Sequence, residues 1–165
     1  MSEVFPYDSA GEVPLKGYAA LAGTFTAGVA LFAVTARRRG VPLPDRVPPW
    51  DLVLLGAATF KASRLLTKDR ITSFLRAPFT RREEDAHAGE VMDAPRGSGV
   101  RRAVGDLVVC PFCTSAWVAA ALVGSYVGAP RATRLLCAGL GAVTLSDWLQ
   151  YAWSATDQRV AGAEG

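Results

Sequence analysis

Long apolar runs separated by polar segments dominate the pattern of this chain. Residues 17–36 contain no Asp, Glu, Lys or Arg, and neither do residues 111–130. A helix needs roughly 20 apolar residues to cross a bilayer, and each run has that length. The two runs therefore predict membrane-spanning helices, and buried helices of a soluble helical bundle are the alternative.

Two further runs are apolar but contain charged residues. Residues 135–156 carry only Asp147, and residues 50–66 are apolar at first and then contain Lys61 and Arg64. The second of these runs makes about 25 Å of helix at about 1.5 Å per residue, and its two cations can extend to the membrane interface. We therefore expect an all-α integral membrane helical bundle with three to four transmembrane helices and a basic cytoplasmic loop.

The 165 residues are enough for one domain. We expect a polar N-terminal tail at 1–16, a single membrane domain at 17–156 and a C-terminal tail at 157–165. The expected spans lie at about 17–36, 50–66, 111–130 and 134–154.

The polar part of the chain between the second and third spans has its own pattern. Asp51 is a plausible cap for the second helix, and that helix is expected to continue as an amphipathic extension to about Arg76, where Pro78 stops it. Residues 80–104 are rich in charge and glycine, which predicts a flexible basic loop.

The net charge of +3 conceals a local excess of basic residues in segment 67–109. Because Lys and Arg favour the cytoplasmic side, this segment is expected to be cytoplasmic in a multi-pass cell-membrane protein. Four spans with a cytoplasmic N-terminus satisfy this but leave Arg37–Arg39 outside. Three spans, with 50–66 re-entrant, place both basic loops inside. Four spans with an external N-terminus export the whole basic loop and are least favoured; we prefer the first arrangement.

Cys110 and Cys113 form a CxxC motif at the start of the third span. One hypothesis is half of a zinc site, completed by a second protomer or by Asp106 and His87, so that zinc is the one possible cofactor. A second hypothesis is a thiol–disulfide pair, although no thioredoxin-like βαβ pattern surrounds it. The third, which we favour, is a structural role at the helix entry.

Basic residues Lys61, Arg64 and Lys68 recur at helical spacing, with apolar residues on the complementary positions. This pattern is typical of a helix on an anionic membrane surface, so the bilayer and its anionic headgroups are the expected partners. A solvated charged face is the alternative. Nucleic acid is not expected, because aromatic residues are sparse and no reader motif is present.

Asp147 is the notable charge of the last apolar run. Ionisable residues within membrane helices usually face the bundle interior and pair with one another. Asp147 and the two cations Lys61 and Arg64 are expected at similar depth, which predicts an interhelical ion pair. Gly124 and Gly128 form a GxxxG motif, which allows close helix approach and a possible homodimer.

Two blocks of the sequence resemble a known family. The blocks KASRLLTKDRITSFLRAPF at 61–79 and GDLVVCPFCTSAWVAA at 105–120 resemble an uncharacterised bacterial membrane family, domain of unknown function 1360. The matching positions are Arg64, Asp69, Arg70, Arg76, Pro78, Gly105, Cys110, Cys113 and Trp117. Asp106 stands where Glu is familiar, and Thr114-Ser115 where Leu-Gly is familiar. The resemblance implies an integral membrane protein in which the two blocks form one site, and it implies no activity.

No recognisable enzyme site is assembled by the sequence. The chain has one histidine, so it contains no HExxH motif, and no catalytic triad is recognisable. P-loop, GxGxxG and GxSxG motifs are also absent. We therefore expect a non-enzymatic membrane interaction or scaffold module with a cytoplasm-facing CxxC. The alternatives are a membrane thiol–disulfide oxidoreductase using Cys110 and Cys113, and a small transporter subunit using Asp147 with Lys61 and Arg64.

Overall fold

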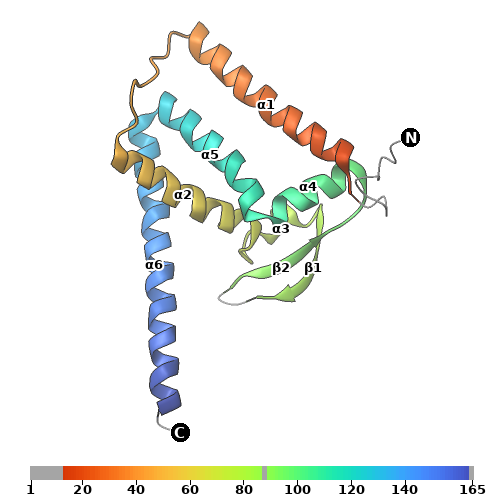
Figure 1. Ribbon diagram of the computed structural model, residues 1–165, viewed down its shortest axis with the longest axis vertical. Helices are drawn as coiled ribbons and strands as arrows, with labels where there is room; N and C mark the ends of the chain where they lie inside the picture. The colour runs from red at the N-terminus through yellow and green to blue at the C-terminus, as the bar shows by residue number, and fades with distance from the viewer. Residues whose placement is uncertain (1–12, 87–88, 164–165) are drawn as a thin grey trace, which may run out of the picture. The chain divides into compact units, whose positions relative to one another are not determined.

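The computed structural model describes residues 13–86 and 89–163, and within them the chain forms six helices and a two-stranded sheet (Figure 1). In chain order the elements are α1 (Leu15–Arg38), α2 (Pro49–Thr67), α3 (Ser73–Arg76), β1 (Thr80–Asp85), β2 (Val91–Pro95), α4 (Gly99–Val109), α5 (Pro111–Gly128) and α6 (Pro130–Ala163). Each of the four expected spans coincides with a helix. The all-α prediction needs correction, because the chain also contains the sheet.

The chain divides into two compact units. The first contains the described residues up to 35 and residues 66–114, and therefore most of α1, the hairpin and α4. The second contains residues 36–65 and the described residues from 115 onward, and therefore most of α2 and α5 and the whole of α6.

The first unit is organised around an antiparallel hairpin of β1 and β2, in which Thr80 lies opposite Pro95 and Asp85 opposite Val91. The prediction of a flexible loop over 80–104 was wrong, because these residues form the hairpin and the first half of α4. Val91 is fully buried and Thr80 is nearly so, whereas the remaining residues of β1 are charged and exposed.

The predicted extension of the second helix to Arg76 was also wrong, because α2 ends at Thr67. The carbonyl oxygen of Lys68 accepts the Val91 N–H at 2.8 Å, and the Arg70 N–H donates to the Gly89 carbonyl at 3.0 Å. Backbone groups that a continuing helix would use internally are therefore bonded to the hairpin. The short helix α3 follows after this break.

Helix α4 packs closely on the hairpin through Gly105. A Cβ atom at this position would lie 2.7 Å from the Phe79 carbonyl oxygen and 2.9 Å from the Pro95 Cβ. A real Cβ cannot approach so closely, so the packing requires glycine. The N-terminal end of α1 contacts the other side of α4, where Gly17 lies against Ala103.

The second unit has an apolar core between α2, α5 and α6. Its buried members are Leu55, Ala58, Leu122, Tyr126 and Cys137. Helices α5 and α6 are joined by the single residue Ala129 and run in opposite directions. Helices α2 and α6 run in the same general direction, because they are joined near their starts by Asp51 and Arg134 and further along by Lys61 and Asp147.

Two boundaries in this unit differ from the sequence predictions. Helix α6 continues to Ala163, so residues 157–163 are helical rather than part of a C-terminal tail. Asp51 lies inside the first turn of α2, which begins at Pro49, and is not its cap. Its carboxylate is instead bonded to Arg134 and Tyr126.

Candidate functional site

Arg76 is the centre of the first unit, where its side chain is 1% exposed. Its Nε donates to Asp93 Oδ2 at 2.9 Å, and the Asp93 side chain is only 5% exposed. The two terminal nitrogens donate to two carbonyl oxygens and two hydroxyls, those of Leu66, Asp69, Thr72 and Ser73. Arg76 therefore ties the end of α2 and the following turn to β2, and it serves the fold rather than a solvent-facing site.

Two other residues of the family pattern hold the same turn. Asp69 Oδ1 accepts the Ile71 N–H at 2.9 Å, and the Asp69 backbone bridges to Glu90. Arg70 pairs with Asp85 of β1 at 3.3 Å, with both side chains more than half exposed. Residues 68–76 are thus bonded to the hairpin at several points, and the sequence had not paired them with residues 80–95.

Asp106 and Trp117 lie on different helices. Asp106 of α4 accepts the Tyr18 hydroxyl at 2.9 Å, which links α4 to α1, and it pairs with Arg102 at 3.4 Å. Trp117 is half-buried on α5, in the second unit. Gly105 of the second family block packs against the Phe79 carbonyl of the first, and the expectation that the two blocks form one functional site remains a prediction.

Cys110 and Cys113 lie where α4 meets α5. Cys110 is the extended residue between the two helices, and Pro111 is the first residue of α5. The Cys113 N–H donates to Cys110 Sγ at 3.3 Å. Both cysteines are free thiols; Cys110 is half-buried and Cys113 is exposed. The Cys110 sulfur therefore occupies the place of a helix cap at the positive end of the helix dipole.

The surroundings of Cys110 favour its thiolate. Burial raises the pKa of Cys110. Hydrogen bonds from the Cys113 thiol and from the N–H groups of Cys113 and Phe112, together with the Lys68 ammonium, lower the pKa by a larger amount. The pKa of Cys110 therefore lies below its ordinary value. Such a thiol is more nucleophilic at neutral pH than an ordinary cysteine.

A metal site is not assembled by the described part of the chain. No group of three or more His, Cys, Asp and Glu side chains within residues 13–86 and 89–163 is placed to hold an ion. His87, a possible helper ligand, lies outside the described residues. The described geometry therefore offers two thiols to a zinc ion, whereas a structural zinc site has four ligands.

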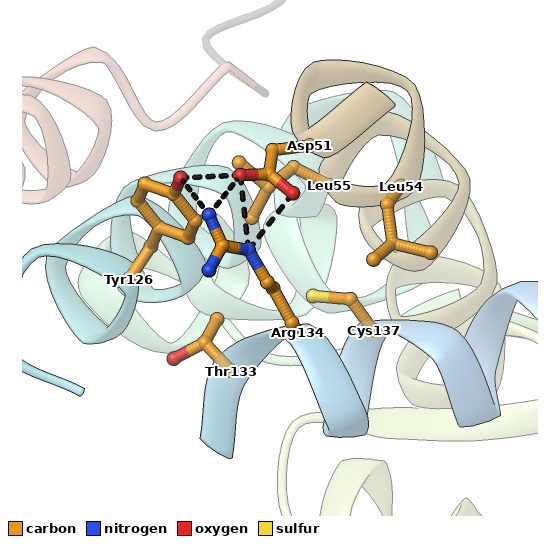
Figure 2. A pocket seen from close by; sticks show the side chains of 7 residues that line it. All are labelled: Asp51, Leu54, Leu55, Tyr126, Thr133, Arg134 and Cys137. Carbon is orange, nitrogen blue, oxygen red and sulfur yellow. Dashed lines mark hydrogen bonds and ion pairs between the residues drawn. The ribbon is translucent and has the colours of Figure 1, made fainter. Parts of the chain in front are cut away.

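A charged cluster that the sequence did not predict joins the three helices of the second unit (Figure 2). Arg134 at the start of α6 binds both oxygens of Asp51, with Nη2 at 2.6 Å from Oδ2 and Nε at 2.9 Å from Oδ1. The Tyr126 hydroxyl donates to the same carboxylate, and the Arg134 guanidinium lies 5.4 Å from the Tyr126 ring centroid. The available signal was the presence of opposite charges at the starts of two apolar runs.

The same cluster lines a small hollow with Leu54, Leu55, Thr133 and Cys137 (Figure 2). The side chains fill it so closely that no space of the size of a water molecule remains. The Cys137 thiol points into this packed region and is 1% exposed. The cluster therefore acts as a lock between helices rather than as a ligand pocket.

A second ion pair joins α2 and α6 further along. Lys61 Nζ lies 2.7 Å from Asp147 Oδ2, with side chains 13% and 36% exposed. Of the two cations expected near Asp147, the structure brings Lys61 to it, whereas Arg64 lies over the Phe60 ring at 5.9 Å. Leu55 and Ala58 of the apolar core lie along α2 between this pair and the Asp51 cluster.

The outer surface of the second unit is apolar. Large hydrophobic side chains exposed on it are Trp50, Leu52, Val53, Phe60, Val123, Leu135, Leu136, Val143, Leu145, Trp148, Leu149, Tyr151 and Trp153. A water-soluble domain rarely exposes large apolar patches. The ion pairs of Asp51 with Arg134 and of Lys61 with Asp147 join helices, whereas these apolar side chains lie outside.

By length and composition, two of the described helices are apolar enough to cross a membrane. These are α1 and α5. Helices α2 and α6 carry charged residues within their apolar stretches, part of which are paired within the second unit. The structure therefore has two candidate spans, and the finer prediction of three or four spans remains a prediction.

Comparisons with known proteins agree with the resemblance noted in the sequence. Residues 54–153 match the model of a family described as "Protein of unknown function (DUF1360)". The chain is also similar to "Sporulation protein YjcA" of Bacillus subtilis (strain 168), with 34% identity over 110 residues, which cover 60% of this chain and 93% of the relative. No solved structure matches.

Proposed function

Because the chain belongs to the DUF1360 family of proteins of unknown function, we propose its role from its geometry. We propose that it is a multi-pass protein of the bacterial cell membrane that acts as a non-enzymatic interaction or scaffold module. In this proposal the second unit lies in the bilayer, and the hairpin of the first unit is presented to a partner on the cytoplasmic side.

One observation carries the membrane assignment, namely the reversed polarity of the second unit. Its charged residues Asp51, Lys61 and Asp147 are paired between helices, whereas tryptophan, leucine and valine side chains cover its outside. Charged residues in membrane helices face the bundle interior and pair, because hydrocarbon offers them no other partner. In a soluble domain, lysine and aspartate are mostly exposed.

The directions of the three helices support consecutive crossings of the bilayer. Helix α5 runs opposite to α2 and to α6, as three successive spans would. Together with α1, this favours four spans with the basic segment 67–109 on the cytoplasmic side. The exposed apolar residues Ile71, Phe74 and Phe112 then accompany basic residues at the interface, where anionic headgroups are the expected lipid partners.

The scaffold role is supported by how the first unit uses its charged residues. Arg76, Asp69 and Arg70 are bonded to the hairpin and the turn beside it. Residues used in this way position a surface, and they are not arranged around a space for a substrate. The hairpin therefore suits a rigid platform that a partner protein recognises.

Labelling of single cysteines tests the topology. The background has all three native cysteines replaced by serine, and each variant adds one cysteine: Asp45→Cys, Glu84→Cys, Ala129→Cys or Arg159→Cys. Intact cells whose cell wall has been removed, so that the cell membrane is accessible, are treated with a membrane-impermeant maleimide. We expect labelling of Asp45→Cys and Ala129→Cys from outside, and of the other two only after permeabilisation. Protection of Asp45→Cys alone among the external sites indicates three spans.

The same preparation tests the membrane assignment itself. We expect the wild-type protein to stay in the membrane pellet after extraction with alkaline carbonate. Release into the supernatant, or equal labelling of all four cysteine variants before permeabilisation, contradicts a multi-pass arrangement. Crosslinking from a photoreactive residue at Arg81, which is 70% exposed on β1, then tests for a partner at the hairpin.

A second candidate function is favoured by the position of Cys110. A thiolate held at a helix N-terminus beside a second thiol suits thiol–disulfide exchange. A transporter subunit using Asp147 with Lys61 and Arg64 has less support, because an apolar cluster lies between the two ion pairs of the second unit.

A further inference from the structure

We propose that Cys110 and Cys113 divide one thiol-exchange reaction between them: Cys110 attacks a disulfide carried by a partner protein, and Cys113 resolves the resulting mixed disulfide. This inference rests on the second candidate function and is independent of the scaffold role.

The attacking role of Cys110 follows from the placement of its sulfur. It lies at the N-terminal end of α5, which is an 18-residue helix, and it accepts the Cys113 N–H at 3.3 Å. The helix dipole stabilises negative charge at this end. The Cys113 thiol donates to the same sulfur, and the Lys68 ammonium acts on it from the turn after α2. Four donors or positive charges therefore converge on Cys110, counting the Phe112 N–H.

The resolving role of Cys113 follows from its complementary surroundings. Its sulfur is exposed, and as the donor to Cys110 it is the partner that retains the shared proton. The acidic group that interacts with Cys113 is Asp106 of α4, whereas the basic group that acts on Cys110 is Lys68. The two sulfurs are thus neighbours in opposite electrostatic environments, which is the condition for assigning them different roles.

The reaction balances with a protein disulfide as the oxidant. The Cys110 thiolate attacks one sulfur of that disulfide, whose S–S bond breaks, so that a mixed disulfide forms and one partner thiolate leaves. Cys113 then loses its proton and attacks the Cys110 sulfur, forming the Cys110–Cys113 disulfide and releasing the second partner thiolate. The partner gains two electrons and, with two protons, becomes a dithiol. One of these protons came from Cys113 and the other from the ionisation of Cys110.

The third cysteine provides an internal control. Cys137 is 1% exposed in the apolar core of the second unit, so it is expected to take no part in the exchange. The variant Cys137→Ser therefore isolates the pair without touching it.

The test uses the full chain in detergent with an aromatic disulfide, 5,5′-dithiobis(2-nitrobenzoate), as the probe. In the Cys137→Ser background we expect two thiolates to be released per chain and an internal disulfide to remain. With Cys113→Ser added, we expect one thiolate and a stable mixed disulfide at Cys110. With Cys110→Ser added, we expect release to be about tenfold slower at neutral pH.

The pH dependence gives a second readout. Because the pKa of Cys110 lies below its ordinary value, the alkylation rate of the Cys113→Ser variant by iodoacetamide should reach half its maximum at a lower pH than that of a free cysteine. Lys68→Gln should move that midpoint upward, whereas Arg81→Gln on the exposed strand should not.

Two results overturn the proposal in different ways. If Cys110→Ser reacts as fast as Cys113→Ser, or faster, the assignment of roles is wrong although exchange remains. If the protein with both cysteines keeps one or two probe groups bound as mixed disulfides and forms no internal disulfide, the pair does not perform exchange and the second candidate function fails.

Discussion

Each of the two units contains an ion pair with little access to solvent, and the side chains that surround the two pairs differ. In the first unit, Arg76 and Asp93 are nearly inaccessible, and carbonyl and hydroxyl oxygens satisfy the remaining guanidinium donors. Charged residues such as Arg81 are exposed on the hairpin of that unit. In the second unit, Lys61 and Asp147 pair between helices whose outer faces are apolar.

The surroundings of the two pairs therefore differ. Arg76 and Asp93 join a hairpin that carries charged side chains on its surface, where such a pair stabilises one backbone arrangement and contributes little net free energy. Lys61 and Asp147 pair between helices that expose large apolar side chains, which is the arrangement expected of charges in membrane helices. The comparison therefore supports the proposal of a helical bundle in the bilayer and a hairpin outside it.

The strongest challenge to this comparison is removal of Arg76. Arg76→Ala leaves Asp93 buried without its main partner and should lower the free energy of unfolding of the first unit by about 3–5 kcal/mol. Hydrogen exchange of residues 80–95 in detergent measures this. Arg81→Ala, at an exposed pair, should change it by less than about 1 kcal/mol. Similar losses in both variants contradict the central role of Arg76.

Removal of Asp51 probes the bundle in the same way. Asp51→Ala deprives Arg134 and Tyr126 of a shared acceptor, and charged hydrogen bonds of this kind contribute about 1.5–3 kcal/mol. We expect a loss of about 2–3 kcal/mol in unfolding of the detergent-solubilised protein by dodecyl sulfate, followed by circular dichroism. Asp45→Ala, in the exposed connector, is the matched control and should be neutral. If Asp51→Ala and Asp45→Ala unfold alike, the cluster of Asp51, Tyr126 and Arg134 does not stabilise the bundle.

Substitution of a glycine by alanine is expected to have opposite effects on stability in the two units. Gly105→Ala places a Cβ against the Phe79 carbonyl and Pro95 and should destabilise the first unit by about 1–3 kcal/mol. Gly139→Ala meets no atom within 4 Å and should stabilise α6 by up to about 1 kcal/mol. Thermal unfolding of the two variants measures both changes in stability, a loss for Gly105→Ala and a gain for Gly139→Ala. A neutral Gly105→Ala would show that α4 does not pack tightly on the hairpin.

The smallest effect is expected at Lys61 and Asp147, which are joined by one contact, whereas Asp51 is bonded to both Arg134 and Tyr126. The double variant Lys61→Asp with Asp147→Lys should recover about 1 kcal/mol relative to the sum of the two single variants. Arg64→Asp combined with Asp147→Lys should recover less, because Arg64 lies over Phe60. A double-mutant cycle in dodecyl sulfate measures both couplings. Equal coupling energies would show that Lys61 and Arg64 both interact with Asp147, which contradicts the assignment of Lys61 as its partner.

The sequence was sufficient for the four long helices α1, α2, α5 and α6 and insufficient for the hairpin and for the shorter helices α3 and α4. Long apolar runs located the four helices because apolar length is a local property that needs no partner. The strands TRREED and VMDAP lack alternating apolar residues, so neither carries a strand pattern. Their pairing depends on Val91 and on the Arg76–Asp93 contact, which becomes visible only when distant segments meet.

The candidate sites were predictable to different extents. The CxxC motif is contiguous and was located directly, whereas the hydrogen bond from Cys113 to Cys110 required the start of α5 to be placed at Pro111. Asp147 had two possible partners at similar depth, and one helical turn separates Lys61 from Arg64. A buried arginine such as Arg76 could not be foreseen, because arginine is usually exposed unless a specific partner is present.

The ion pair between α2 and α6 has a consequence for how the protein is synthesised. Lys61 precedes its partner Asp147 by 86 residues. At roughly 5–20 residues per second, about 4–17 seconds of translation separate the two. In the proposed membrane arrangement, α2 must therefore wait beside the insertion machinery or a chaperone with an uncompensated ammonium until α6 emerges. Assembly of the bundle becomes a late event of translation, and a chain truncated before residue 147 should be a substrate for membrane proteases.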